Sequence, residues 1–476
     1  MLRLFRHHLN VFSISVALVE AALIYGLSKS LYVTIGYYKH FPIQDGILTF
    51  PTLLATVVEL SMVSVGMYSQ RHFFNSGEMV GRTIVSLPLA ALGSVIIIIM
   101  IEYLFASGHS YWMYLWCAAS IAAFFPAVLI IRKICLNGLD RVDWMKTRLV
   151  VLGTGERVAK INELSRELHH RSFTVLGYLQ FKTSDSSDDV ENRTDSNGVQ
   201  HQNFVVDPKD IVSFCQDNNI DEIVVAMKER RGMPVKDLLE CKLNGISIAD
   251  FATFWERNCG QVELEDLSPS WLLFSDGFEM GPIRSLIKRV FDITVAITIL
   301  VLTAPICIIT AILTKLESDG QIFYLQERVG QQGKSFMIIK FRSMRVDAEA
   351  SGPRWASKND SRVTRVGSFI RKVRIDEIPQ VINVLKGDMS LVGPRPERPV
   401  FVKVLAEKIP YYNARHAAKP GITGWAQINY PYGATEEDAR KKLSYDLYYI
   451  KNGSSFLDAV TLLQTVKVLL WNDGAH

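Results

Sequence analysis

Long apolar runs dominate the first part of the chain. Four of them, at residues 11–27, 47–68, 84–101 and 111–131, are each about as long as a helix that crosses the ~30 Å hydrocarbon core of a bilayer. No small-residue cleavage site follows the first run, so we expect a retained span and not a cleaved signal peptide. The pattern predicts a four-helix transmembrane domain over residues 1–135.

Basic residues predict how these spans are oriented. They lie before the first run, between the second and third runs, and after the fourth, whereas residues 106–110 carry none. The residues concerned are Arg3, Arg6, Arg71, Arg82, Arg132, Lys133 and Arg141. Lys29 and Lys39 fall on the opposite side and are the minority. By the positive-inside rule, both ends of the bundle are expected in the cytoplasm.

Two carboxylates, Glu20 and Glu59, fall inside predicted spans. A carboxylate within the bilayer is a candidate for a lipid or proton path. The alternative is a protonated carboxyl that hydrogen-bonds between helices. We favour the alternative, because nothing else polar is expected to converge on these two residues.

Beyond the bundle, buried strands alternate with helical stretches. Strands are predicted at residues 148–152, 175–179 and 222–226, with a helix at 207–218. This alternation predicts a small α/β, Rossmann-like domain over residues 145–267. Its first turn, Gly153-x-Gly155-x-x-Val158, lacks the third small residue of a dinucleotide fingerprint. We therefore interpret the domain as a degenerate scaffold, with nucleotide binding as the alternative, and residues 182–202 as a surface loop.

A fifth apolar segment lies at residues 293–313, between Lys288 and Lys315. Basic residues on both sides oppose crossing of the membrane. Pro305, in the middle, removes a backbone donor and kinks a helix. A re-entrant hairpin over residues 291–316 satisfies both facts. The alternative is an ordinary fifth span, which would place everything beyond residue 316 outside the cell.

Candidate phosphate-binding groups follow. Residues 336–344 predict a strand that places Lys340 and Arg342 on one face, which suits a diphosphate unless the face is merely exposed. The basic stretch 362–374 includes Arg371, and such a run is usually a solvated or headgroup-facing surface. Arg395 stands between Pro394 and Pro396, which would hold its guanidinium ready for a bidentate phosphate contact, or form a rigid solvent-exposed turn.

Asp376 and Glu377 stand at the predicted start of a short helix that Asp376 caps and Gly387 ends. A helix N-terminus attracts phosphate through its free amides. Two adjacent carboxylates would repel that phosphate unless a divalent cation lay between them. The functional interpretation is therefore one nucleophile and one metal ligand acting on a phosphate. The alternative is a capping aspartate with a first-turn glutamate, and these residues alone leave both open.

Composition narrows the class of protein. The chain is 49% hydrophobic and 21% charged, which excludes a disordered chain and argues against a wholly soluble one. A net charge of +4 is too small a surplus to indicate nucleic acid as a partner. The six cysteines form no C-x-x-C pair, so we expect reduced, structural thiols in a cytoplasm-facing protein.

A series of motifs closely resembles the bacterial sugar transferases, the monotopic polyprenyl-phosphate phosphoglycosyl transferases. They are GQIFYLQERVG at 320–330, KFRSM at 340–344, DEIPQ at 376–380, NVLKGDMSLVGPRP at 383–396, KPGITGW at 419–425 and YDLYYI at 445–450. The resemblance marks residues 280–476 as the catalytic domain. The spans and the Rossmann-like domain resemble the long form of the family, and residues 221–226 and 269–276 its exopolysaccharide, exosortase-associated branch. Ala304 departs from the serine usual before the hairpin proline.

The resemblance implies a fold and a reaction. It implies a membrane protein that joins an α-helical bundle, an α/β Rossmann-like domain and a mixed α/β catalytic domain with a re-entrant hairpin. Sugar-1-phosphate would pass from a UDP-sugar to polyprenyl (undecaprenyl) phosphate with release of UMP, as the first membrane step of exopolysaccharide synthesis. The enzyme would lie in the bacterial inner membrane with its catalytic domain in the cytoplasm. The hairpin must then return to the side it entered from.

The resemblance also assigns residues. Asp376 matches the nucleophile, which would form a covalent phosphosugar, and Glu377 matches a carboxylate associated with Mg²⁺. The matching positions that line the active site are Lys340, Arg342, Arg371, Arg395 and Asp446. A homodimer is a further expectation.

Two rival functions are open to test. A membrane-bound nucleotide-sugar dehydratase or epimerase would need an intact dinucleotide fingerprint and a Tyr-x-x-x-Lys pair on a following helix, and the Rossmann-like region offers neither. A non-catalytic scaffold for polysaccharide assembly fits the first half of the chain. It leaves Asp376, Glu377 and Arg395 unexplained.

Overall fold

The computed structural model describes residues 2–4, 7–9, 11–39, 49–65, 67–68, 76–105, 110–139, 147–166, 173–181, 202–228, 233–265, 267, 272–273, 275, 278, 281–345, 362–431, 433 and 435–471. The chain forms two compact units. The first comprises residues 1–2 and 8–258, and the second comprises residues 3–7 and 259–476.

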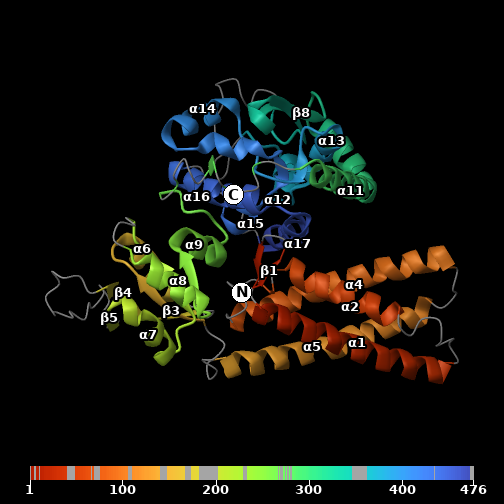
Figure 1. The fold of residues 1–476 in the computed structure, drawn as a ribbon. Helices are drawn as coiled ribbons and strands as arrows, with labels where there is room; N and C mark the ends of the chain where they lie inside the picture. Colours follow the sequence, from red (N-terminus) through yellow and green to blue (C-terminus); the bar gives the residue numbers. More distant parts are fainter. Residues whose placement is uncertain are drawn as a thin grey trace. The chain divides into compact units, whose positions relative to one another are not determined.

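The first unit contains a bundle of four apolar helices (Figure 1). They are α1 (Val11–Lys39), α2 (Thr49–Ser64), α4 (Ser76–Phe105) and α5 (Ser110–Leu139). α1 packs on α2 and α5, and α4 packs on the same two helices, so the four close a ring. A pair of short strands, β1 (Leu2–Leu4) and β2 (His7–Leu9), comes before them in the chain.

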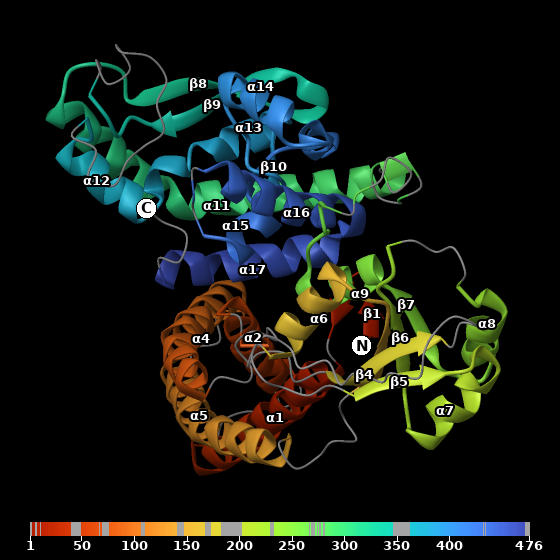
Figure 2. The ribbon, with the colours of Figure 1, turned by 90° about the vertical axis from the view of Figure 1, so that its left-hand side faces the viewer.

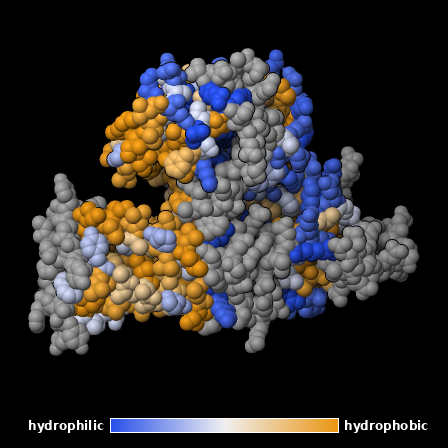
Figure 3. All heavy atoms as spheres, turned by 180° about the vertical axis from the view of Figure 1, so that it is seen from behind, coloured by the Kyte–Doolittle hydropathy of each residue, from blue (hydrophilic) through white to orange (hydrophobic). Residues whose placement is uncertain are grey.

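The helices differ in length from the predicted spans. α1, α4 and α5 each contain a segment long and apolar enough to cross a membrane. α2 has 16 residues instead of the 22-residue run predicted, and at 1.5 Å per residue it covers only about 24 Å. The fourth helix in the described part of the chain with the length and composition of a span is α11 (Pro282–Glu317), in the second unit. The bundle shows an apolar surface in Figure 3.

A charged network lies inside the bundle. Arg132 donates from Nε and Nη2 to the two carboxylate oxygens of Glu20 at 2.6 Å, and both side chains are fully buried. The Tyr68 hydroxyl lies 2.5 Å from Glu20 Oε2 and 2.7 Å from Glu59 Oε2. The expectation that nothing polar converges on these carboxylates is therefore wrong. Helix packing brings in Arg132 from 112 residues away, and its guanidinium pairs with the carboxylate of Glu20.

The rest of the first unit is a parallel five-stranded sheet with the order β5-β4-β3-β6-β7 (Figure 2). Its strands are β3 (Thr147–Leu152), β4 (Phe173–Phe181), β5 (Gln202–Val206), β6 (Glu222–Val225) and β7 (Ser247–Asp250). Its helices are α6 (Glu156–Arg166), η2 (Pro208–Asp210), α7 (Ile211–Asp217), α8 (Val235–Leu243) and α9 (Phe251–Cys259). This doubly wound order confirms the Rossmann-like prediction. The predicted loop 182–202 lies outside the described residues except Gln202, which begins β5.

The glycine turn of this sheet is tightly packed. Gly153 has φ +130°, and a Cβ at that position would lie 2.9 Å from the backbone nitrogen of Met227. Arg157 Nη1 donates to the Met227 carbonyl at 2.8 Å. The chain that follows β6 therefore lies directly against the turn in which a dinucleotide fold accepts its pyrophosphate.

The second unit is a mixed α/β domain around one apolar core. After α11 come β8 (Phe323–Val329), η3 (Gln331–Gly333), β9 (Ser335–Phe341), α12 (Arg365–Lys372), η4 (Ile375–Glu377), α13 (Gln380–Lys386) and β10 (Ser390–Val392). α14 (Pro399–Lys408), η5 (Tyr412–Ala417), β11 (Gly421–Thr423), α15 (Trp425–Asn429), α16 (Glu436–Asn452) and α17 (Ser455–Trp471) complete it. β8 and β9 pair antiparallel, and β10 and β11 pair parallel.

α11 buries polar residues and exposes apolar ones, the reverse of a helix on the surface of a soluble protein. It buries Asp292, whose carboxylate accepts from the Ser390 hydroxyl at 3.1 Å and the Leu391 amide at 3.2 Å. Its apolar side chains, such as Val301 (67% exposed) and Leu302 (68% exposed), point outward. An apolar outer face suits contact with lipid.

The predicted hairpin at 291–316 is not confirmed. The structure describes a single helix that continues through Pro305 from Pro282 to Glu317. A proline inside a helix removes one hydrogen bond and kinks the helix axis without necessarily ending the helix.

Candidate active site

A left-handed residue places the two carboxylates. α12 ends at Lys372, and Arg374 then adopts φ +59°, which is uncommon for a residue other than glycine. The turn leads into η4, where Asp376 (8% exposed) and Glu377 (9% exposed) are both buried. The prediction that Asp376 caps the next helix is wrong, because α13 begins only at Gln380, after Pro379.

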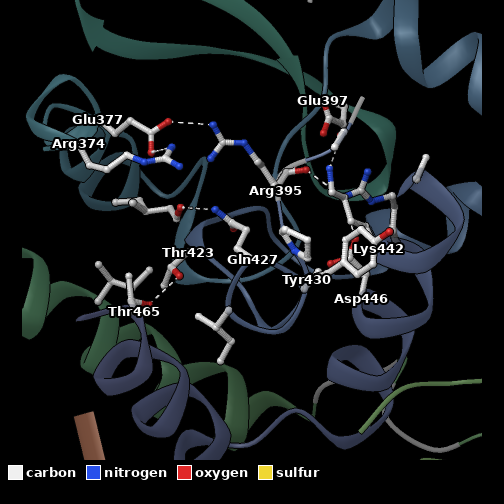
Figure 4. A pocket seen from close by; sticks show the side chains of 18 of the residues that line it. Arg374, Glu377, Arg395, Glu397, Thr423, Gln427, Tyr430, Lys442, Asp446 and Thr465 are labelled. Carbon is white, nitrogen blue, oxygen red and sulfur yellow. Dashed lines mark hydrogen bonds and ion pairs between the residues drawn. The ribbon is translucent and has the colours of Figure 1, made fainter. Parts of the chain in front are cut away.

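Three cations surround Glu377, and Figure 4 shows two of them, Arg374 and Arg395. Lys340 Nζ and Arg395 Nη2 each lie 2.9 Å from Glu377 Oε1. Arg374 Nη1 lies 3.7 Å from Glu377 Oε2. The carboxylate therefore gathers one cation from β9, one from the loop after β10 and one from the turn before η4.

Side-chain and glycine contacts hold two of these cations in place. Asn383 accepts from the Ile339 amide at 3.0 Å and donates to the Met337 carbonyl at 2.8 Å, so it fixes the strand that carries Lys340. Close approach of β10 and β11 fixes the loop that carries Arg395. A Cβ on Gly421 would lie 2.1 Å from the backbone nitrogen of Gly393, so only glycine allows the strands to come this close.

The two carboxyls differ in ionisation. Burial opposes ionisation of Glu377, but Arg395, Lys340 and Arg374 outweigh it and hold its pKa well below its usual value. Burial, with the charge of Glu377, raises the pKa of Asp376 from 3.8 to about 6. Glu377 is thus a firmly charged anchor, whereas Asp376 keeps a higher proton affinity.

A cavity of about 370 Å³ lies beside this cluster. Arg374, Glu377 and Arg395 line one part of it, and Lys442 and Asp446 of α16 line another. Other lining residues are largely apolar, and they come from α11, α13, α14, β11 and α17. The cavity therefore combines a strongly charged wall with extended apolar walls.

Asp446 belongs to a buried network on the α16 side of the cavity. Its carboxylate lies 2.8 Å from Arg415 Nη2, which also donates to the Arg395 carbonyl at 3.0 Å. Burial raises the pKa of Asp446 to about 6, although Arg415 opposes the shift. The network links the α16 side of the cavity to the backbone of Arg395.

Comparison with known proteins places this arrangement in a family. A model of the bacterial sugar transferase family matches residues 283–472. An undecaprenyl-phosphate glucose-1-phosphate transferase that uses UDP-glucose, from Xanthomonas campestris pv. campestris, is 31% identical over 366 residues, which are 75% of this chain and 74% of that protein. The chain belongs to the bacterial sugar transferase family.

Two other relatives of this sugar transferase show how far the similarity reaches. A UDP-N-acetylgalactosamine-undecaprenyl-phosphate N-acetylgalactosaminephosphotransferase from Aeromonas hydrophila is 44% identical over 239 residues, 50% of this chain and 56% of that protein. An undecaprenyl-phosphate glucose phosphotransferase from Komagataeibacter xylinus is 30% identical over 366 residues, 74% of this chain and 65% of that protein. The chain thus spans less than two thirds of the length of each of these two relatives. A model described as a CoA-binding domain matches residues 64–248.

The structure brings most of the predicted site residues of this sugar transferase together. Lys340, Glu377 and Arg395 are in direct contact, and Asp376 precedes Glu377 in η4. Asp376 is not among the residues that line the cavity, whereas Glu377 and Arg395 are. Asp446 lines the α16 side.

Arg342 and Arg371 occupy other positions. Arg342 lies just beyond the end of β9 and donates to the carbonyls of Thr314, Ser318 and Asp319, at the end of α11. The expectation that Arg342 and Lys340 face one diphosphate is therefore not supported for Arg342, because three carbonyls occupy its guanidinium. Arg371 is half-buried in the last turn of α12, and its charge is among those that favour the ionised form of Asp376.

Sequence reasoning did not assign Arg374, Glu397 or Lys442 to the site, yet all three line the cavity. One signal was present for Lys442, which precedes Asp446 by four residues on a helix and so shares its face. The role of Arg374 depends on its left-handed backbone, which the sequence does not reveal.

The donor atoms present fit a magnesium ion. The described residues contain no cluster of three or more His, Cys, Asp or Glu side chains suited to a metal. Magnesium at a phosphate site needs only one or two carboxylates, because waters and substrate phosphates complete its shell. Asp376 Oδ1 is buried without a hydrogen-bond partner, and Glu377 Oε2 lies 3.7 Å from Arg374 Nη1.

Proposed function

We propose that this protein transfers sugar-1-phosphate from a UDP-sugar to polyprenyl phosphate and releases UMP, as the first membrane step of exopolysaccharide synthesis. The observation that carries the proposal is the pair of buried carboxylates in η4. One is neutralised by three cations at a cavity wall, and the other has an unpartnered oxygen. The activities for which the Aeromonas and Xanthomonas relatives are named support the same class of donor and acceptor.

The first displacement uses Asp376 as the nucleophile. Lys340, Arg374 and Arg395 bind the diphosphate of the donor and neutralise its charge. A carboxylate oxygen of Asp376 attacks the phosphorus that bears the sugar, and the bond from that phosphorus to the bridging oxygen breaks. UMP leaves with the bridging oxygen and its electron pair, and the phosphosugar stays on Asp376. Bound magnesium, held by Glu377, would supply further neutralisation of the phosphate charge.

The second displacement regenerates the enzyme. A phosphate oxygen of the lipid attacks the same phosphorus, and the bond to Asp376 breaks, so the carboxylate returns and the lipid carries a diphosphate-linked sugar. Two displacements suit a water-borne donor and a membrane-borne acceptor, because the two need never be bound at once.

The electrostatics favour Asp376 over Glu377 as the nucleophile. Three cations hold the charge of Glu377, which lowers its basicity and its tendency to attack. Asp376, with a pKa of about 6, is mostly ionised at neutral pH yet more basic than an ordinary aspartate.

The decisive experiment omits the acceptor. Full-length enzyme in nanodiscs, given Mg²⁺ and each of a panel of UDP-sugars, should release about one UMP per site and gain the mass of a sugar phosphate. Asp376→Asn should abolish both results, whereas Asp319→Asn, the same change at an exposed position, should abolish neither. Glu377→Gln should weaken the dependence on magnesium. If acceptor-free enzyme gives neither UMP nor adduct while full turnover is robust, the lipid phosphate attacks directly.

The proposal includes an orientation at the bacterial inner membrane. Both ends of the bundle and the catalytic domain face the cytoplasm, and α11 enters one leaflet, bends at Pro305 and returns. Cysteines introduced singly at Ser107, Gly333 and His476 should report it with a membrane-impermeant thiol reagent. Ser107→Cys should react from outside and the other two should not. Reaction at Gly333→Cys from outside would refute the hairpin, and Pro305→Leu should straighten the segment and lower activity.

The Rossmann-like domain is proposed to be structural or regulatory and to bind no NAD. Met227 packs against Gly153, where a dinucleotide would place its pyrophosphate. This packing also counts against the dehydratase or epimerase alternative. Stoichiometric, tight binding of NAD to the full-length protein by calorimetry would overturn this part, and the same titration with coenzyme A tests the family description of the domain.

A further inference from the structure

One wall of the cavity is made of hydrocarbon. Leu462, Thr465 and Val466 of α17 line it, with Ile299 of α11 and Ile422 of β11. The three α17 residues are spaced at i, i+3 and i+4 and therefore share one face of the helix. The one hydroxyl among these five side chains, that of Thr465, is already hydrogen-bonded to the Thr461 carbonyl and the Thr423 hydroxyl, each at 2.8 Å. This set of five residues is called the α17 wall below.

The opposite side of the cavity is charged. In Figure 4, Arg395 lies between the Thr423–Thr465 pair on one side and Lys442 with Asp446 on the other. A ligand with a phosphate at Arg395 can thus extend in two directions, along hydrocarbon or toward the polar groups of α16. A UDP-sugar has many hydroxyls and suits the α16 side. A lipid phosphate has one anionic end and a hydrocarbon chain, which matches Arg395 together with the α17 wall.

The α17 wall is also continuous with a surface suited to lipid. Ile299 contributes to the wall from α11, and Leu302 (68% exposed), three residues further along and so on the same side of the helix, points outward. A hydrocarbon chain that follows α11 therefore meets apolar side chains from the helix surface to the cavity.

We propose that the α17 wall binds the first isoprene units of the polyprenyl phosphate acceptor and guides its phosphate toward Arg395. The inference rests on the proposed function, and it assigns the two substrates to different sides of one cavity. It makes Leu462 and Val466 determinants of acceptor binding, while the donor is held by the charged wall.

Bulky substitutions in the α17 wall test this assignment. Leu462→Trp and Val466→Trp should raise the KM for polyprenyl phosphate at least tenfold, because the indole fills the space of an isoprene unit. In the absence of acceptor, both variants should still release about one UMP per site with donor and magnesium. Gln464→Trp adds the same bulk to α17 at a position that does not line the cavity, so its KM should match that of the unmodified enzyme.

Two other kinetic results would overturn the proposal. If the Trp variants lose the release of UMP or show a raised KM for the UDP-sugar alone, the wall holds the nucleotide. If no kinetic constant changes, the wall holds neither substrate.

A second measurement needs no substitution and guards against variants that do not fold. Polyprenyl phosphate with a photoreactive group on its first isoprene units, irradiated with the unmodified full-length enzyme in nanodiscs, should label the peptide that contains α17. Labelling confined to other peptides would overturn the proposal. Failure of the proposed function would give a different result. The unmodified enzyme would then release no UMP and form no adduct, whichever peptide the lipid probe labels.

Discussion

Two regions of this protein bury carboxylates among arginines, and they balance their charges differently. In the bundle, Glu20 and Arg132 meet in a two-point ion pair that is fully buried, and the Tyr68 hydroxyl contacts Glu20 and Glu59. In the second unit, Glu377 faces three cations within 4 Å, and the adjacent Asp376 keeps one buried oxygen without a partner. The bundle cluster sets one arginine against two carboxylates, and Glu59 Oε1, like Asp376 Oδ1, is buried without a hydrogen-bond partner. The second cluster differs in its cations, which outnumber its carboxylates, and this surplus suits an anionic substrate.

This difference separates structural from functional burial of charge. Removal of one partner of a buried ion pair strongly destabilises a protein. Replacement of both partners by apolar residues of similar volume often does not. In the second unit, burial and the charge of Glu377 raise the pKa of Asp376, whereas the surrounding cations oppose that shift. Loss of one charged residue should therefore destabilise the bundle cluster, whereas loss of the charge of Asp376 should stabilise the second unit.

The largest expected effect is on catalysis. Asp376→Asn should lower turnover by at least ~10⁴-fold, because it removes the proposed nucleophile and leaves no group to replace it. The thermal midpoint of the same variant should rise at pH 7.5, since a buried charge is removed. Turnover comes from radiolabelled sugar transfer and the midpoint from scanning fluorimetry of the detergent-solubilised protein. A variant that keeps more than a hundredth of the activity would contradict the assignment.

In the bundle, loss of a charged residue should lower stability instead of raising it. Arg132→Leu leaves the carboxylate of Glu20 buried without its cation and should destabilise the protein by about 3–5 kcal/mol. The double variant Glu20→Leu, Arg132→Leu should recover most of that loss, and transfer per folded molecule should match the unmodified enzyme. Recovery of stability is measured by thermal unfolding in the same detergent. If the double variant is as unstable as the single one, the network stabilises the bundle by more than charge neutralisation.

A smaller effect is expected at Arg342, and it tests whether this arginine supports the fold or binds the donor. Arg342→Lys should cost about 1–3 kcal/mol of stability, because a lysine cannot reach the three carbonyls that the guanidinium holds. The KM for the UDP-sugar should stay within about twofold. Lys340→Met is the contrasting variant, and it should raise that KM or lower kcat with little loss of stability. A large change in KM for Arg342→Lys would return this arginine to the diphosphate site.

The smallest effect is a pH dependence. Below pH 6, Asp376 becomes protonated, so the acceptor-free release of UMP should slow about tenfold for each unit of pH. Asp446 also has a pKa raised to about 6, whereas burial and then Arg415 lower the pKa of His416 to about 4. The effect on stability follows from linkage. Because folding raises the pKa of this carboxyl from 3.8 to about 6, the free energy of unfolding falls as the pH rises through that interval. An acid limb that moves to lower pH in Glu377→Gln and to higher pH in Arg374→Gln would support this origin.

The sequence alone predicted many of the helices and strands, for identifiable reasons. Apolar periodicity located the bundle helices and strands β3, β4, β6 and β9, because burial of one face imposes its period on the chain. β5 and β7 were not predicted. β7, with few buried residues, gave little periodic signal. Gly387, with φ +97°, ended its helix as predicted because glycine alone adopts that conformation without strain.

What the sequence determined by itself is local: which residues are apolar enough for a membrane, where helices and strands form, and which charged side chains cluster along the chain. The tertiary structure decided which of those charges meet. It joined Arg132 to Glu20 across 112 residues, turned Arg342 to the end of α11, and brought Arg374 to Glu377 through one left-handed residue. The physical reason is that an ion pair depends on a few ångströms of separation and on burial, and these are set by packing between elements far apart in the chain.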